Sequence, residues 1–340
     1  MRHLRIQRPA VPGVALRLLL PALFLAFLFT WGSPACVFGQ SSDLAGFAFL
    51  RLDPSARAAS MSGSYTAVGG SDVNGLFYNP ALLNEDVDHS LSLSYLNHVA
   101  GLNAGFVAYA RDVEGIGTLG AGIRYLGYGD LRGADDTGAE TGTFGASDVA
   151  LTVGASRAYN AHLRYGANLH AIYSHIDTYS ASALAVDLGV VYHLDGPAIT
   201  LAASINNLGQ TLSTYADAGV ALPTDIRISV AKQLRHVPLL LSITGYNLNR
   251  PGDVPDDAPT VGRVMQFVLI GGELRFSDAF QIRFGYNHRR HEALATRSHL
   301  DLAGLSLGAG IKVSRLRIDY AYSTWSGAGG LHEFTVRTRL

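Results

Sequence analysis

Apolar and polar side chains alternate along most of the chain after its first forty residues. In 279–288, large apolar side chains share one face, and polar residues and glycine share the other. The first face holds Phe280, Ile282, Phe284 and Tyr286, and the second holds Gln281, Arg283, Gly285 and Asn287. Successive side chains of a β-strand point to opposite faces, so this period predicts a strand with one apolar and one wet side. No later segment offers the roughly 18 consecutive apolar residues of a transmembrane helix.

The same alternation recurs in 162–174, where Ile172 is the single exception, and in 315–323. In the latter segment Arg317 and Asp319 share the polar face, and neighbouring opposite charges suit a polar interior. The interior faces assigned in this way carry Arg164, Asn168, His170, Gln281, Arg283, Asn287, Arg317, Asp319, Glu333, Arg337 and Arg339. An interior this polar argues against a conduit for lipids.

Fourteen such segments predict an all-β fold, a 14-stranded antiparallel transmembrane β-barrel over residues 87–340. Each segment runs about ten residues or more, the length that a tilted strand needs to cross a bilayer, and the even number fits a bacterial single-chain barrel. The predicted strands lie near 88–99, 102–112, 115–129, 147–158, 161–176, 179–193, 197–208, 222–234, 236–247, 263–276, 279–288, 301–312, 315–324 and 331–340.

The connections between these segments alternate in length. Tight turns are expected at 112–115, 158–161, 194–197, 234–237, 276–279 and 313–315, and longer connections at 130–146, 210–221, 249–262, 288–300 and 325–330. Outer-membrane barrels have short periplasmic turns and longer external loops. We therefore expect the cell outer membrane as the location, with both termini periplasmic.

The last segment, 331–340, alternates up to its final residue, with Phe334, Val336 and Leu340 on the outward side. Such a strand can pair with the first one and leave no backbone group unpaired in lipid. The segment also resembles the C-terminal signal that outer-membrane assembly machinery reads. The composition agrees with a β-rich chain that has no nucleic-acid partner, since only 16% of residues are charged and the formal net charge is −1.

Residues 1–39 have the pattern of a secretory signal peptide. A basic region with four arginines precedes a short apolar core, and Gly39 fits the small-residue rule for cleavage. Cys36 is the only cysteine and leaves lipidation open as an alternative. Cleavage after Gly39 predicts an exported protein with no disulfide.

Between the signal and the first strand, residues 40–86 form a segment without period-two alternation. It contains Ala56-Arg57-Ala58, then Met61 and Gly63, and later Tyr78-Asn79-Pro80-Ala81. Pro80 fixes its own φ and disfavours helix at Asn79, so this pair predicts a rigid turn. The turn either folds the segment back into the lumen or lies on the surface.

These motifs resemble the N-terminal hatch of the long-chain fatty-acid channel (FadL) superfamily, and more closely the PorV/PorQ family of type IX secretion. The compact length is nearer to the PorQ branch, as are the segments 79–84, 91–97, 285–290 and 304–312. The resemblance implies a hatch segment with Ala56, Arg57, Asn79, Pro80 and Ala81 as its motif. The Met61-Ser62-Gly63 stretch departs from the pattern, because relatives often have a second glycine there.

For function, the resemblance implies a non-enzymatic barrel that anchors the cell-surface attachment complex. Its partners would be outer-membrane lipid, the surface protein PorZ, the sortase-like PorU and the carrier PorV, with catalysis in PorU. Two alternatives remain open: a FadL-like transporter of hydrophobic compounds and a PorV-like carrier of secreted cargo. We expect no cofactor and no metal site.

Other motifs carry little chemistry. The G-x-G-x-x-G match at 115–120 lies inside a predicted strand, whereas a dinucleotide site needs it between a strand and a helix. Scattered His, Ser and Asp residues leave open a triad assembled in space.

Two predicted external loops concentrate charge. One holds Asp135, Asp136 and Glu140, and the other holds Arg289, Arg290, His291, Arg297 and His299. Both sets suit a solvated rim. The sharper hypothesis is that Arg289 and Arg290 contact lipopolysaccharide phosphates and that the acidic loop binds a hard cation such as calcium.

Overall fold

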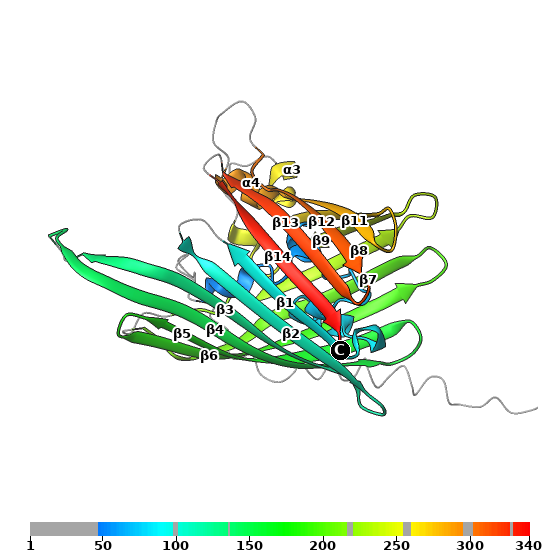
Figure 1. Cartoon of the computed structure of the whole chain (residues 1–340), viewed down its shortest axis with the longest axis horizontal. Helices are drawn as coiled ribbons and strands as arrows, with labels where there is room; N and C mark the ends of the chain where they lie inside the picture. Colours follow the sequence, from blue (N-terminus) through cyan, green and yellow to red (C-terminus); the bar gives the residue numbers. More distant parts are fainter. Residues whose placement is uncertain are drawn as a thin grey trace, which may run out of the picture. The chain divides into compact units, whose positions relative to one another are not determined.

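The chain folds into a closed antiparallel β-barrel of fourteen strands (Figure 1). This computed structural model describes residues 47–97, 101–134, 137–215, 220–253, 260–294, 302–326 and 329–340. The strands are β1 Ser90–Asn97, β2 Asn103–Val113, β3 Gly117–Ala134, β4 Glu140–Ala158, β5 Leu163–Ile176, β6 Tyr179–Leu194, β7 Ile199–Ser213, β8 Asp225–Gln233, β9 Leu239–Gly245, β10 Val268–Arg275, β11 Phe280–Asn287, β12 Leu305–Val313, β13 Leu316–Ser326 and β14 Gly329–Arg339. The predicted fold class and strand number are confirmed.

Each strand pairs with its neighbours in sequence, and β14 closes the sheet against β1. The closing pair runs from Ser90 opposite Arg339 to Asn97 opposite His332 without a shift in register. Closure leaves no strand edge, which is the condition that a sheet must meet to stand in hydrocarbon. The terminal strand therefore has the pairing that the sequence predicts.

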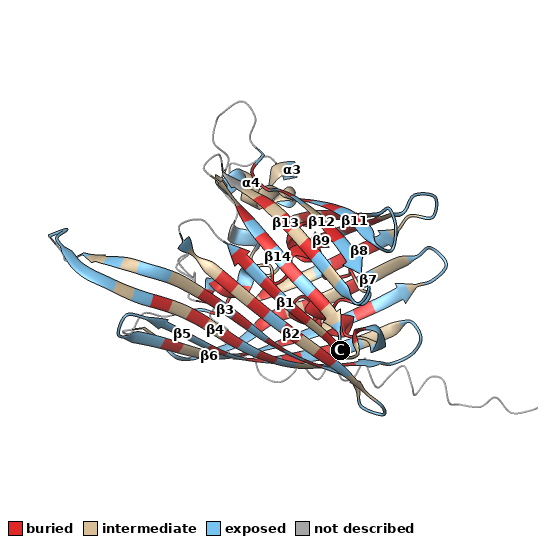
Figure 2. Cartoon of the chain, in the orientation of Figure 1, coloured by how far each residue is buried: buried red, intermediate tan, exposed pale blue. Residues whose placement is uncertain are grey.

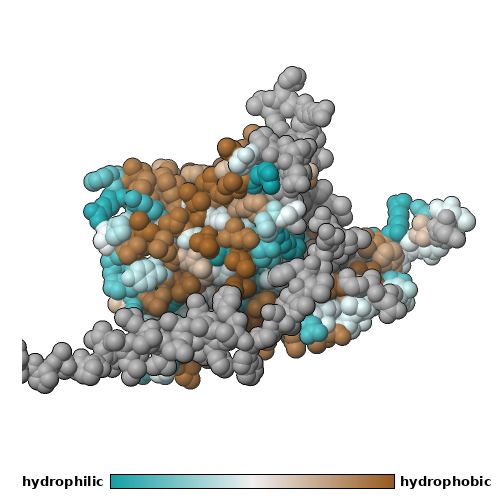
Figure 3. Space-filling view, turned by 180° about the vertical axis from the view of Figure 1, so that it is seen from behind, coloured by the Kyte–Doolittle hydropathy of each residue, from teal (hydrophilic) through white to brown (hydrophobic). Residues whose placement is uncertain are grey.

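Burial alternates residue by residue along the strands, visible as red and pale blue blocks in Figure 2. The exposed positions carry large apolar side chains such as Leu93, Ile123, Leu151, Phe334 and Val336. Figure 3 shows such side chains over much of the outer wall. Exposed aromatic residues occur near both ends of the strands: Tyr159, Tyr165, Tyr192, Phe276 and Phe280 near the tight turns, and Tyr95, Tyr125, Tyr173 and Tyr179 near the opposite end. Aromatic girdles around an apolar band are typical of transmembrane barrels.

The predicted boundaries differ most from the structure in three places. The expected loop at 130–146 is largely a hairpin, because β3 and β4 continue to pair as far as Ala134 opposite Glu140. The expected strand at 263–276 begins only at Val268, after the helix α3 (Thr260–Met265), and the helix α4 (His288–Leu294) stands in the expected loop at 288–300. Most side chains in the hairpin extension are exposed on both faces, so backbone pairing persists there without an apolar signal.

The segment before β1 packs inside the barrel as a series of single-turn helices. These are η1 Ala48–Arg51, α2 Ala56–Ala59, η2 Val73–Phe77, η3 Pro80–Leu82 and η4 Glu85–Val87; a further turn, η6 Pro251–Asp253, follows β9. Side-chain oxygens of Ser55, Asp72, Asn79 and Asn84 cap α2, η2, η3 and η4 in turn. Such caps satisfy backbone N–H groups that no ladder reaches. The segment thus lies where a hatch is expected, and we use that name for residues 47–88.

The predicted signal peptide lies outside the described residues and stays a prediction. Within the described parts of the chain, no helix combines the length and apolarity needed to cross a membrane.

Candidate functional site

The hatch motif fits against wall positions that lack a side chain. A Cβ added to Gly189 on β6 would lie 1.9 Å from Asn79 Oδ1, and one added to Gly166 on β5 would lie 2.7 Å from the Pro80 carbonyl carbon. The Asn79 amide donates to the carbonyl of Thr66 at 3.1 Å, within the hatch. It also donates to the carbonyl of Val190, on the wall, at 3.3 Å. The rigid turn at Asn79-Pro80 therefore lies in the lumen, and Pro80 and Ala81 are buried with it.

The opposite flank of the hatch meets the wall in the same way. A Cβ on Gly285 would lie 2.3 Å from the Met61 carbonyl carbon, and one on Gly271 would lie 2.9 Å from Met61 Cβ. From β3, Arg124 donates to the backbone oxygens of Leu50 at 2.8 Å and Phe77 at 3.1 Å. Atoms of the hatch thus fill the space that side chains at these wall positions would occupy.

Three arginines and three carboxylates form a closed ring between the hatch and strands β10 to β14, here called the ion-pair ring. The hatch supplies Arg57, from the predicted motif, and Asp72. Six contacts close the ring: Arg57–Glu273 (2.8 Å), Glu273–Arg283 (2.7 Å), Arg283–Asp319 (2.6 Å), Asp319–Arg337 (2.7 Å), Arg337–Asp72 (3.0 Å) and Asp72–Arg57 (3.5 Å). None of the six side chains is more than 8% exposed.

The ring satisfies its own charges. Arg57 also donates to the Tyr65 hydroxyl at 2.8 Å, which in turn donates to Asp72 at 2.6 Å. Burial alone raises the pKa of the Asp72 carboxyl, but Arg337 and Arg57 outweigh it and lower that pKa to about 2. Asp72 is therefore ionised at any physiological pH. A buried charge is tolerated where a partner of opposite sign and further hydrogen bonds accompany it, and each ring member has two such partners.

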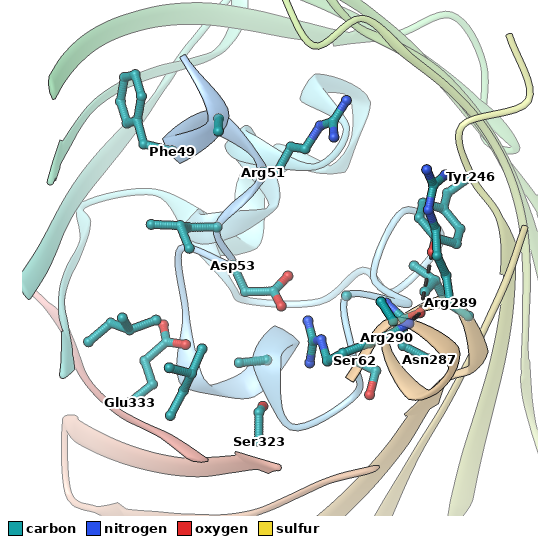
Figure 4. Close-up of a pocket in the computed structure, with 18 of the residues that line it drawn as sticks. Phe49, Arg51, Asp53, Ser62, Tyr246, Asn287, Arg289, Arg290, Ser323 and Glu333 are labelled. Atoms are coloured by element: carbon teal, nitrogen blue, oxygen red, sulfur yellow. Dashed lines mark hydrogen bonds between the residues drawn. The ribbon is translucent and has the colours of Figure 1, made fainter. Parts of the chain in front are cut away.

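A cavity of about 510 Å³ lies above the hatch, toward the long connections. Figure 4 shows Asp53 pointing into it from the hatch, with Glu333 at one side and Arg289 and Arg290 at the other. Further charged and amide side chains line it, among them Arg51, Asp225, Arg227 and Asn247. Leucines and aromatic residues supply its apolar lining: Phe49, Leu52, Leu96, Leu102, Leu126, Tyr128, Tyr246, Leu269, Leu294 and Leu331. The cavity is amphipathic, with volume for a small molecule.

The polar interior inferred from the sequence covers only part of the lumen. Leu96, Phe106, Leu126 and Ile172 face inward from β1, β2, β3 and β5 and pack with Phe49 of the hatch. We call this cluster the apolar flank. Ile172, the exception in its predicted strand, is an inward residue of this flank. The polar positions inferred from sequence came from β5, β11, β13 and β14, so they sampled a limited part of the wall.

Arg289 and Arg290 lie on α4, which folds over the cavity, and both are partly buried. Figure 4 shows their guanidinium groups beside Asn287 and Tyr246, directed toward the cavity. Their contact with lipopolysaccharide stays a prediction. Of the other charged loop residues, Glu140 begins β4 and His291 lies on α4, whereas Asp135, Asp136, Arg297 and His299 fall outside the described residues.

One buried trio has the form of a catalytic triad. The Thr152 hydroxyl lies 2.8 Å from His170 Nδ1, and His170 Nε2 lies 2.6 Å from Asp187. Thr152 and His170 are each 1% exposed, so no substrate can reach the hydroxyl. The trio is a structural cross-strand network. Among the described residues, no group of three or more His, Cys, Asp or Glu is arranged to hold a metal ion.

Sequence reasoning found four ring members and missed two. Arg57 belonged to the hatch motif, and Arg283, Asp319 and Arg337 were assigned to the interior. Glu273 alternates with Gly271 on the inner face of β10, a signal that was present in the sequence. Asp72 lies in the non-periodic hatch, where no pattern marks it.

No protein-family model and no curated protein matches this chain. Solved structures do match. The Pseudomonas putida toluene transporter TodX has 12% sequence identity and a TM-score of 0.53, over 83% of this chain and 96% of the transporter. A TodX monoaromatic hydrocarbon channel mutant has 13% sequence identity and a TM-score of 0.55, over 84% of this chain and 97% of the mutant. A Pseudomonas aeruginosa FadL homologue has 12% sequence identity and a TM-score of 0.50, over 84% of this chain and 98% of the homologue. The chain therefore has a FadL-type fold.

Proposed function

We propose that this chain is an outer-membrane barrel that holds a protein complex on the cell surface in type IX secretion, rather than an open channel. The observation that carries the proposal is the fixed hatch. The ion-pair ring ties it to β10, β11, β13 and β14, and close packing against glycines ties it to β5 and β6. A passage along the lumen would require the hatch to move, and separating a buried ion pair typically costs about 3–5 kcal/mol.

The membrane placement rests on the outer wall. An exposed apolar band lies between two sets of aromatic side chains, and six of the connections at one end are tight turns. By the usual rule for such barrels the tight turns are periplasmic. The termini and the ion-pair ring then lie toward the periplasm, and the long connections face outside.

The β3–β4 hairpin supplies a surface for a partner. Beyond the register shift at Gly127, residues 130–134 pair with 140–145 with most side chains exposed. By the resemblance to the PorV/PorQ family, the partner complex would contain PorZ, PorU and PorV. Catalysis would then belong to PorU.

Site-specific photo-crosslinking in intact cells tests this proposal. A crosslinking residue at Thr143, in the hairpin, should capture a surface protein, and one at Ile116, in a tight turn, should not. Intact secretion in a deletion strain, together with no capture from any long connection, would overturn the platform role.

A channel for hydrophobic compounds is the second candidate. The cavity of about 510 Å³ beside the apolar flank favours it, and the fold resembles that of proteins described as a toluene transporter and a monoaromatic hydrocarbon channel. A disulfide between hatch and wall separates the two functions. Ser64 Oγ in the hatch and Ser242 Oγ on β9 lie 3.0 Å apart, which suits a Ser64→Cys, Ser242→Cys pair.

Under oxidising conditions the locked barrel should keep its surface complex, with each single cysteine variant as control. Loss of hydrocarbon uptake on locking, restored by a reductant, would support the channel instead. Because surface capture and uptake are separate readouts, either function can fail independently.

A further inference from the structure

Five basic side chains surround a second cavity, at the tight-turn end of the barrel. It has a volume of about 290 Å³ and lies between the β12–β13 turn, the last residues of β14 and the hatch. Its charged lining consists of Lys312, Arg315, Arg317, Arg337 and Arg339, with Asp86 as the only carboxylate in that lining, and its hydroxyl groups come from Ser71, Ser90, Ser314 and Thr338. The lining is strongly cationic and rich in hydrogen-bond donors.

Strand register creates this concentration of charge. Lys312 on β12 is directly opposite Arg317 on β13, which is directly opposite Arg337 on β14. Lys312 and Arg317 are flanked along their strands by exposed apolar residues, and Arg337 lies on the buried face of β14, so all three lie on the lumen side. Like charges directly opposite one another on a sheet are destabilising. A row of three cations therefore needs compensation from another source.

The protein compensates this row only in part. Arg337 is paired with Asp72 and Asp319 in the ion-pair ring, whereas Arg317 donates to a neutral oxygen of Gln281 at 2.6 Å. Within the described part of the chain, no carboxylate makes an ion pair with Lys312. The buried Nε of Arg337 also has no hydrogen-bond acceptor among the described residues.

We propose that this cavity binds a phosphate group, carried by a phospholipid headgroup or by a soluble phosphate compound. Phosphate oxygens accept several strong hydrogen bonds, arginine offers them a planar fork, and lysine adds a compact charge. The cavity borders the hatch at Ser71 and Val73 as well as the ring at Arg337. An occupant therefore stabilises the hatch from the end opposite the surface partner.

Two variants of equal charge loss test the site. The pocket variant is Lys312→Gln with Arg315→Gln. The control variant is Arg157→Gln with Lys232→Gln, which removes the same charge near other tight turns, outside the cavity. Both should fold, as judged by the mobility of the unboiled barrel in a gel, because neither removes a ring member.

For the lipid source, each protein is extracted from nanodiscs of phosphatidylcholine with phosphatidylglycerol, and native mass spectrometry counts the retained phosphatidylglycerol. For the soluble source, calorimetry measures pyrophosphate binding in nanodiscs of phosphatidylcholine alone. In the pocket variant we expect binding of either phosphatidylglycerol or pyrophosphate to be at least about tenfold weaker, because this variant loses two charge-assisted contacts. The control variant should bind both with little change. Equal binding by both variants in both measurements would overturn the proposal.

Discussion

The two sides of the hatch are held by different physical means. Toward β10 to β14, charged side chains meet in the ion-pair ring, whose geometry is directional. Toward β5 and β6, backbone and small side chains of the hatch pack closely against wall glycines, beside hydrogen bonds such as Asn79 to Val190 and a partly exposed Arg164–Glu85 ion pair. The ring therefore specifies where the hatch lies, whereas the packing makes any other position sterically poor. Substitutions on the two sides should therefore have different signatures.

The largest effect should come from breaking the ring. Arg57→Ala leaves Glu273 and Asp72 buried with fewer partners, and removing one member of a buried ion pair costs about 3–5 kcal/mol. Urea titration of the refolded barrel in lipid measures the free energy of unfolding. Arg132→Ala is the control, because its pair with Glu140 is exposed and should contribute under about 1 kcal/mol. Similar losses in the two variants would contradict a structural role for the ring.

Overpacking the opposite side should have the next largest effect. In Gly166→Ala the new methyl group meets backbone atoms of Pro80 and Ala81 within 2.8 Å, which a side-chain rotation cannot relieve. We expect a loss of about 3 kcal/mol, the upper end for overpacked cores. Gly105→Ala on β2, where no atom lies within 4 Å of the new Cβ, is the matched control. A Gly166 variant as stable as the Gly105 variant would show that the hatch is loosely packed on this side.

The pH dependence of stability tests the ring directly, through Asp72. The pKa of Asp72 is about 2 in the folded protein against a reference value of 3.8. A depressed carboxyl pKa stabilises the folded state above the unfolded value, and that stability is lost as the pH falls toward the folded value. The difference corresponds to about 2 kcal/mol. Asp72→Asn should remove this part of the slope between pH 4 and pH 2, measured by urea titration; an unchanged slope would contradict the pairing.

The smallest effect is expected from the cap on the packed side. Asn79→Ala removes the side-chain acceptor for the Ala81 N–H and the donor to Thr66 and Val190, and loss of a cap costs about 1 kcal/mol. Asn79→Ser should keep a capping oxygen and lose only the amide contacts. An alanine variant less stable than the Gly166→Ala variant would reverse the proposed order of the two contributions.

The sequence predicted the wall far better than the contents of the lumen. Alternation identified all fourteen strands because the membrane imposes one apolar face on every one of them. The extension of the hairpin beyond Gly127 was not predicted, because both of its faces are exposed and it therefore has no apolar–polar alternation. Asp72 was not predicted because the hatch sequence has no hydrophobic periodicity. Its role also depends on β14, which places Arg337 beside it in the folded barrel. The apolar flank was missed because inward residues such as Leu96 and Phe106 look, in sequence, like members of an outward face.

The closing pair of strands has a consequence for the order of assembly. Thr335 on β14 accepts a hydrogen bond from the backbone N–H of Ala56 and shares another with Ser94 of β1. One hydroxyl group thus joins the hatch, the first strand and the last strand. A hatch that is inside before the final seam is sealed would serve as a template on which β14 finds its register. A hatch variant should then slow closure as well as weaken the finished barrel.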